Sequence, residues 1–282
     1  GVVDVVDLRL DKLSDLSKSE KKIYTNITFV DIAGLVKGAS KGEGLGNKFL
    51  SHIRQVDAII HLVRCFKSEK ISHVNSEINP INDLETIKTE ILLSDIDLIN
   101  KKLEKSKRKL LSENEIEILS KKLHFLNQGE DKTEYNETDT KFLSSLGLLS
   151  LKPRIIVCNV DEASLAKGNE FTRMIESKYK KEKIVTICAD IEDQIMGLDK
   201  NERETFMKEI GLNKTGLNKL IKEGYDLLEL ETFFTSGPKE SRAWTVQKNT
   251  LAPKATSVIH TDFEKNFIRV ETVTCEDFIK FG

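Results

Sequence analysis

A short apolar stretch near the start of the chain ends in an acidic residue, which alanine and glycine soon follow. Residues Ile27 to Val30 are rich in β-branched side chains, and Asp31, Ala33 and Gly34 come after them. An aspartate at the carboxyl end of a buried strand is what nucleotide-hydrolysing α/β domains place beside their magnesium ion. A glycine amide can approach the γ-phosphate because no side chain blocks it. These residues therefore indicate a nucleoside triphosphate site, in which Asp31 holds Mg²⁺ through water and Gly34 contacts the γ-phosphate.

The stretch after Asp31 is rich in glycine, at positions Gly34, Gly38, Gly42, Gly44 and Gly46. The last three resemble part of a dinucleotide fingerprint, which needs G-x-G-x-x-G directly after a strand. Here the third glycine comes one residue early, and ten residues separate Asp31 from Gly42. A phosphate-sensing loop explains the glycines better than a dinucleotide site.

Three further apolar stretches read as buried strands: 58–66, 154–158 and 183–188. A helical stretch at 169–181 separates the last two, and another follows over 202–230 with a break near Gly211. Strands that alternate with helices predict a parallel sheet, whose ligands bind at the carboxyl ends of its strands. Asp31, Asn159 and the pair Cys188-Ala189 all fall at such ends, which favours one site built from them.

The tetrapeptide Asn159-Val160-Asp161-Glu162 occupies the place where a GTPase carries Asn-Lys-x-Asp. In GTPases the aspartate accepts from the two donors of guanine, and the lysine stem packs on the base. Here Val160 replaces the lysine, and Glu162 is one methylene longer than aspartate. Losing that acceptor pair removes what favours guanine, since polar pairs discriminate more strongly than apolar pockets. Taken alone, the four residues also fit an ordinary turn after a strand.

From residue 82 the pattern becomes helical. Two sets of apolar residues recur at helical spacing: Leu84, Ile87, Ile91, Leu98 and Leu103, and then Ile116, Leu119, Leu123 and Leu126. Asp83 is the expected cap of the first helix, and Ser112 with Glu115 fits a capping box for the second. We expect an antiparallel helical hairpin inserted into the nucleotide domain.

The first of these helices carries a basic run from Lys101 to Lys109, in which six of nine residues are Lys or Arg. The run is either a solvated helix face or a contact to ribosomal RNA. After residue 232 the composition favours strands again, at 233–235, 243–246 and 267–273.

The whole chain sets limits on these readings. Its 282 residues suffice for one large or two to three small domains, and a net charge of −2 gives no overall attraction to nucleic acid. No apolar run approaches the ~20 residues of a membrane span, so we expect no membrane partner. The four cysteines show neither metal spacing nor a disulfide framework, which indicates buried thiols in a reducing compartment.

Several segments of the sequence resemble those of one known family and occur in the same order: DIAGLVKGASKGEGLGNKFLSHIR, HLVRCF, NVDE, FFTSGPKESRAWTV and IHTDFEKNFIR. They closely resemble the Obg-like ATPases, the YchF family of translation-factor-related P-loop NTPases. The resemblance covers nearly the whole chain.

The resemblance implies an α/β architecture with a P-loop NTPase-type parallel sheet, an inserted α-helical coiled-coil hairpin and a C-terminal β-grasp (TGS) domain. The nucleotide-binding domain is then expected at 1–80 and 152–231, the insertion at 81–151 and a truncated TGS domain at 232–282. The sequence contains no G-x-x-x-x-G-K-[ST] motif. By resemblance the P-loop and the switch-I magnesium ligand lie just before Gly1, and we expect residues 1–282 alone to be inactive.

The resemblance also implies an activity: hydrolysis of ATP to ADP and phosphate with Mg²⁺ as cofactor. The implied protein is cytoplasmic, binds the ribosome or ribosomal RNA, and regulates translation or a stress response. Family members with this altered base motif are similar in preferring ATP. Asn159, Val160, Glu162 and the backbone of Cys188 and Ala189 are therefore expected around adenine.

Leu35 stands where many GTPases place the glutamine that orients the attacking water, a task that leucine cannot perform. The candidates to replace it are His52, His61 and His73. His61 lies inside an apolar stretch, which favours core packing, and His52 shows no preference. His73 follows in a polar loop where the family carries a histidine thought to be catalytic, so we expect His73 to position the water.

Two other functions remain open at this point. One is an ordinary GTPase, which Val160 and Glu162 disfavour. The other is a nucleotide-gated ribosome- or RNA-binding regulator whose turnover is incidental.

Overall fold

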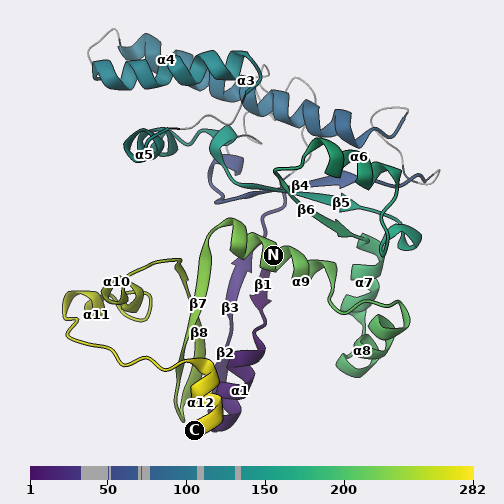
Figure 1. The fold of residues 1–282 in the computed structure, drawn as a ribbon, viewed down its shortest axis with the longest axis vertical. Coiled ribbons are helices and arrows are strands. Elements are labelled where there is room, and N and C mark those ends of the chain that lie inside the picture. The colour runs from purple at the N-terminus through teal and green to yellow at the C-terminus, as the bar shows by residue number, and fades with distance from the viewer. Residues whose placement is uncertain (33–49, 51, 69–70, 72–76, 107–110, 131–134) are drawn as a thin grey trace. The chain divides into compact units, whose positions relative to one another are not determined.

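The computed structural model describes residues 1–32, 50, 52–68, 71, 77–106, 111–130 and 135–282 (Figure 1). The chain forms two compact units, one of residues 1–31 with 221–282 and the other of residues 32–220. This division groups residues 1–31 with the C-terminal part, whereas the expected nucleotide domain combined 1–80 with 152–231. The expected domain limits stay a prediction.

A three-stranded parallel sheet is the centre of the unit at 32–220. Its order is β4 (Ile59–Arg64), β5 (Arg154–Asn159) and β6 (Lys183–Ile187). The middle strand β5 is buried along four consecutive residues, which is the pattern of a parallel strand with both faces covered. The predicted parallel sheet is therefore confirmed, and Arg64, Asn159 and Ile187 lie together in its register at the carboxyl edge.

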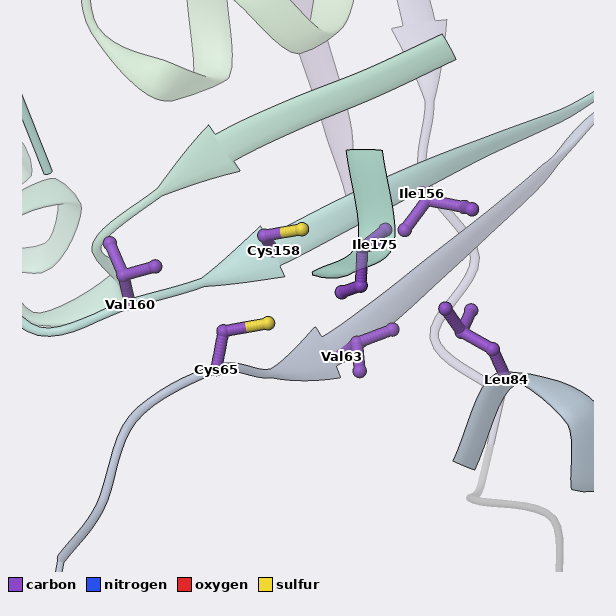
Figure 2. Close-up of a cluster of buried hydrophobic side chains, with 7 residues drawn as sticks. All are labelled: Val63, Cys65, Leu84, Ile156, Cys158, Val160 and Ile175. Atoms are coloured by element: carbon purple, nitrogen blue, oxygen red, sulfur yellow. The ribbon is translucent and has the colours of Figure 1, made fainter. Parts of the chain in front are cut away.

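One face of this sheet packs against helices α3 (Pro80–Ser106) and α6 (Glu170–Lys178). Figure 2 shows the buried side chains of this core, which are Val63, Cys65, Leu84, Ile156, Cys158, Val160 and Ile175. Asn169 caps the start of α6, and its side chain accepts from the Thr172 amide at 3.1 Å. The same side chain donates to the Cys65 carbonyl at 2.7 Å, so the start of α6 is tied to the chain that leaves β4.

Between β4 and β5 the chain forms the helical insertion: α3, α4 (Glu113–Asn127), α5 (Glu137–Ser145) and the 3-10 turn η1 (Leu149–Leu151). Helices α3 and α4 lie side by side (Figure 1), and the prediction of an antiparallel hairpin is confirmed. Their shared core consists of Leu92, Ile99, Ile118, Leu119, Leu126, Leu143 and Leu148.

The two helix starts of the hairpin test the predicted caps. Ser112 accepts from the Glu115 amide at 3.3 Å, and Glu115 accepts from the Ser112 amide at 2.7 Å, so the predicted capping box is confirmed. The prediction that Asp83 caps the first helix is wrong. That helix starts at Pro80, and the Asn79 side chain accepts from the Asn82 amide at 3.0 Å. Proline suits a first helical position because its missing N–H needs no partner there.

Beyond β6, three helices follow: α7 (Ala189–Gly197), α8 (Lys200–Glu209) and α9 (Gly216–Leu227). The predicted break near Gly211 is confirmed. Gly211 has a φ of 70°, in the left-handed region that glycine adopts without a Cβ clash, and this ends α8.

The other unit joins the two ends of the chain. Strand β1 (Val2–Val5) pairs antiparallel with β3 (Thr25–Thr28). Strand β2 (Lys21–Ile23) pairs parallel with β8 (Glu240–Gln247), which pairs antiparallel with β7 (Leu230–Ser236). Helix α1 (Leu8–Leu16) follows the side-chain cap Asp7 and buries Leu10 and Leu13. The predicted strands at 233–235 and 243–246 are thus confirmed.

The last part of this unit contains three short helices: α10 (Ala252–Thr256), α11 (Thr261–Lys265) and α12 (Cys275–Phe281). The predicted strand at 267–273 is wrong, since this stretch pairs with no strand in the described structure. Three of its apolar side chains are exposed to solvent: Ile268, Val270 and Val273. A stretch with strand-like composition becomes a strand only when a neighbouring strand supplies hydrogen-bond partners.

No helix among the described residues is long and apolar enough to cross a membrane. The four cysteines are free, and Cys65, Cys158 and Cys188 are buried, as expected for structural thiols.

Candidate functional site at the carboxyl edge of the parallel sheet

Asn159 ends β5 and connects this strand to the start of α7. Its Oδ1 accepts from the Ala189 amide at 3.0 Å. The next amide, that of Val160, donates to the Ile187 carbonyl at 2.9 Å. The structure therefore brings together the strand ends that the sequence placed in one site, at Asn159 and at Cys188-Ala189.

The side chain of Val160 does not face this edge. It is 2% exposed and packs in the core with Cys65, Cys158 and Ile175 (Figure 2). A contact from Val160 to a bound base is therefore limited to its backbone.

The two acids of the tetrapeptide have different surroundings. Asp161 accepts from the Ser164 amide at 2.9 Å and caps the 3-10 turn η2 (Glu162–Ser164). Glu162 is exposed at the first position of that turn. Asp161 is thus occupied by a local backbone contact, while Glu162 presents its carboxylate to solvent.

Cys188 and Ala189 form the start of α7. Cys188 is 1% exposed, whereas Ala189 is exposed. Burial raises the pKa of the Cys188 thiol, and the nearby charges of Asp190 and Glu162 act in the same direction. The thiol therefore stays protonated at neutral pH and packs as a small apolar group. At this edge of the sheet, Ala189 is the residue of the pair that is exposed to solvent.

Asp31 is an exposed residue that follows β3 and ends its part of the other compact unit. The prediction of a buried strand of the parallel sheet before Asp31 is wrong. Strand β3 ends at Thr28, alternates half-buried and exposed residues, and pairs antiparallel with β1 in a separate sheet. Gly34 and His73 lie outside the described residues, as does Leu35. The roles assigned to Asp31, Gly34 and His73 stay predictions.

His61 lies in β4 and lines a small pocket beneath α3 with Lys88, Lys152, Arg154 and Tyr179. Burial, together with the nearby charge of Arg154, lowers the pKa of His61 to about 4. The imidazole is therefore neutral at physiological pH, which agrees with core packing. His52, by contrast, is exposed.

Arg64, at the same edge, has no role predicted from the sequence. Arg64 ends β4 and donates to the carbonyls of Phe66 (3.1 Å), Ser68 (3.1 Å) and Ile71 (3.0 Å). Its guanidinium also lies 4.9 Å from the centre of the Phe66 ring. Arg64 thus holds the chain that follows β4 at Phe66, Ser68 and Ile71. An arginine at the polar end of an apolar strand was the available signal.

Within the described residues, no three His, Cys, Asp or Glu side chains gather as a metal site. A magnesium ion does not require such a group, because it keeps several waters and binds through one or two carboxylates together with substrate phosphates. The exposed carboxylate of Asp31 fits this mode of binding.

Comparisons with known proteins bear on the whole chain. A family described as "50S ribosome-binding GTPase" matches residues 13–96. The C-terminal family of YchF GTPases, described as "Protein of unknown function (DUF933)", matches residues 230–282.

Individual relatives match over nearly the full chain. The "Ribosome-binding ATPase YchF" of Bacillus subtilis (strain 168) is 44% identical over 293 residues, covering 100% of this chain and 80% of the relative. The protein of the same name from Escherichia coli O157:H7 is 42% identical over 289 residues, with the same coverage of 100% and 80%. A solved structure, the Schizosaccharomyces pombe YchF GTPase, matches with a TM-score of 0.83 and 35% identity, covering 95% of this chain and 75% of that chain.

The structural match and the parallel sheet confirm the predicted fold class, a GTPase-like nucleotide-binding α/β fold with a helical insertion and a C-terminal YchF domain.

Proposed function

This chain belongs to the YchF family, and we propose that it hydrolyses ATP to ADP and phosphate in a Mg²⁺-dependent reaction and that it acts on ribosomes in the cytoplasm. Relatives that are 42% and 44% identical carry the name "Ribosome-binding ATPase YchF". The observation that carries the choice of base is the altered tetrapeptide at the sheet edge, with Val160 and Glu162 in place of the lysine and aspartate of GTPases.

The proposed role of Asn159 follows its hydrogen bond, and those of Asp31, Gly34 and His73 follow their positions in the sequence. Asn159 accepts from the Ala189 amide and so fixes the start of α7. In this position the start of α7 presents its other backbone groups to the rim of adenine. Asp31 would hold Mg²⁺ through its water shell, and the Gly34 amide would contact the γ-phosphate. Magnesium, when bound, neutralises charge on the phosphate oxygens. His73 is the proposed residue that orients the attacking water, because Leu35 cannot accept or donate a hydrogen bond.

Val160 and Glu162 disfavour guanine for different reasons. Guanine recognition needs a carboxylate that accepts from two neighbouring donors, and Glu162 is one methylene too long to present its oxygens at the aspartate position. The lysine of the GTPase motif has no counterpart, since Val160 is buried in the core. Adenine needs neither group.

Base preference tests the proposal. Glu162 is exposed, so Glu162→Asp is tolerated by the fold, whereas a lysine at 160 would place an ammonium group in the apolar core. In the full-length protein we expect ATP to bind more tightly than GTP. Glu162→Asp should move the preference toward GTP by about 1–3 kcal/mol if the charged acceptor pair is regained. Isothermal titration calorimetry with both nucleotides measures this, and equal affinities in the parent would refute the ATP assignment.

A GTPase is the second candidate function. It is supported by the family description "50S ribosome-binding GTPase" and by the name of the S. pombe relative. A regulator with incidental turnover is the other candidate. Added ribosomes should change the rate of hydrolysis by a ribosome-activated ATPase and leave the rate of such a regulator unchanged.

A further inference from the structure

The helical residues that follow the glycine-rich segment pack on the base of the helical insertion. Leu50 and Ile53 form a buried apolar cluster with Ile91 of α3 and Leu149 of η1, and partly buried Ile32 packs against it. Ile32 and Leu50 are the described residues on either side of 33–49. Side chains at both ends of the Asp-Ile-Ala-Gly and glycine-rich sequence are therefore in one cluster with residues of the insertion.

An arginine adds polar contacts at the same place. Arg54 donates through Nη1 to the Gly147 carbonyl at 2.5 Å and through Nη2 to Ser94 Oγ at 2.8 Å. Its Nη1 also lies 3.8 Å from Asp95 Oδ1. Ser94 and Asp95 belong to α3, whereas Gly147 lies between α5 and η1. One guanidinium thus contacts both the chain that enters the insertion and the chain that returns from it.

Asp95 completes this junction. It is fully buried and accepts from the amides of Leu149 at 2.9 Å and Ser150 at 2.7 Å. A buried carboxylate is tolerated only when hydrogen bonds and an opposite charge compensate for its lost hydration, and the two amides and Arg54 supply both. Asp95 therefore fixes η1 to α3, and Arg54 fixes both to the helical residues after the glycine-rich segment.

We infer that Arg54 and Asp95 are positioning residues that couple the nucleotide site to the helical insertion, so that the affinity for ribosomes depends on which nucleotide is bound. The inference rests on the proposed function, because it takes residues 31–34 as phosphate-contacting and the insertion as a ribosome contact. The planar fork of arginine suits the role, since it holds several acceptors in a fixed geometry that a lysine ammonium cannot reproduce.

The expected size follows from the usual range of such couplings, about 5- to 150-fold in affinity. In the full-length protein, ribosome affinity with a non-hydrolysable ATP analogue and with ADP should therefore differ by about 5-fold or more. Cosedimentation with ribosomes at one salt concentration measures the ratio of the two affinities.

Two variants remove different numbers of contacts from this junction. Arg54→Lys keeps the charge but loses the fork, and Ser94→Ala removes a single acceptor. The ratio should fall toward one in Arg54→Lys and fall partly in Ser94→Ala, while the affinity for the ATP analogue without ribosomes stays at the parent value. Hydrogen exchange gives a second readout at the Leu149 and Ser150 amides that Asp95 accepts. Nucleotide should change their exchange in the parent and leave it unchanged in Arg54→Lys.

Arg203→Lys is the matched control. Arg203 also holds backbone carbonyls, those of Ile195 at 3.2 Å and Leu198 at 3.3 Å, but it joins α7 and α8. This variant should keep the parent ratio.

The outcomes separate the inference from the function on which it rests. A parent that binds no nucleotide or no ribosomes refutes the proposed function together with the inference. A parent that binds ribosomes equally with both nucleotides overturns the inference alone. A parent with nucleotide-dependent ribosome affinity and an Arg54→Lys variant that retains it in full overturns the inference alone. An equal loss in Arg203→Lys also overturns it.

Discussion

At the scale of single residues, His61 shows how burial changes a group that often does chemistry. Its imidazole lies in the sheet beneath α3, and the charged groups in the same pocket, Lys88, Lys152 and Arg154, are all basic. A protonated imidazole would be both desolvated and repelled there, which is why the pKa of His61 falls to about 4. His61 is thus a neutral packing residue within the candidate nucleotide domain.

The lowered pKa of His61 predicts a pH dependence of stability. The unfolded histidine titrates near its ordinary value of 6.5, so between pH 6.5 and about 4 the unfolded state binds more protons than the folded state. Stability contributed by neutral His61 is therefore complete above pH 6.5 and declines as the pH falls. From pH 7.5 to pH 5 the loss from this residue is about 2 kcal/mol.

Urea unfolding of parent and His61→Gln at the two pH values measures this contribution, because the variant lacks the titrating group. The variant should lose less stability than the parent between pH 7.5 and 5, whereas His52→Gln, at an exposed position, should lose as much as the parent. Parallel losses in the parent and in His61→Gln would contradict the assignment.

At the scale of elements, helix α3 carries the first part of the basic run. Lys102 and Lys105 are exposed near its end, while Lys101 lies 2.6 Å from Asp97 in an i,i+4 pair. The remaining residues of the run, 107–109, lie outside the described part of the chain. The choice between a solvated face and a ribosomal RNA contact therefore depends on a measurement at Lys102 and Lys105.

Charge reversal on α3 tests the RNA contact. If Lys102 and Lys105 neutralise phosphates, Lys102→Glu with Lys105→Glu weakens ribosome binding and reduces the salt slope by about 1 for each lost phosphate contact. Basal ATP hydrolysis should stay unchanged, since these residues belong to the insertion and not to the sheet edge. Cosedimentation at several salt concentrations measures the slope.

The matched control for charge reversal changes the net charge equally elsewhere, with Lys208→Glu and Lys214→Glu at exposed positions in and after α8. This pair should bind ribosomes as the parent does. Binding of the α3 variant at parent strength at every salt concentration would identify the run as a solvated face.

At the scale of the whole molecule, the proposed base site and the phosphate site depend on different segments of a protein of this family. The base site proposed here lies at the sheet edge, where Asn159 accepts from the Ala189 amide. The amides and lysine of a P-loop supply most of the phosphate contacts in such proteins, and residues 1–282 contain no G-x-x-x-x-G-K-[ST] motif.

Residues 1–282 by themselves should therefore bind ATP weakly and not hydrolyse it. The comparison is with the full-length protein, by calorimetry with ATP in the presence and absence of Mg²⁺ and by phosphate release. Tight, magnesium-dependent binding by residues 1–282 alone would show that their own side chains complete the phosphate site.

The sequence by itself determined the elements whose signals are local. The parallel strands were predicted because apolar, β-branched stretches alternate with helical ones, and Asn159 and Cys188 were placed at strand ends for the same reason. The Ser112–Glu115 capping box was predicted because its bonds join residues three apart. Most of the sheet edge proposed as the base site follows from such short-range patterns.

Only the tertiary structure decided the features that depend on distant partners. Lys21 pairs with Glu240, which joins the start of the chain to its C-terminal part, and no periodicity encodes that choice. Val160 turned into the core because a strand end can present either its side chain or its backbone, and the packing of α6 against the sheet selects between them. Arg54 meets Gly147 only after the insertion folds back on itself. Contacts of this kind are specified by the packing of whole elements, which the sequence of any one element does not contain.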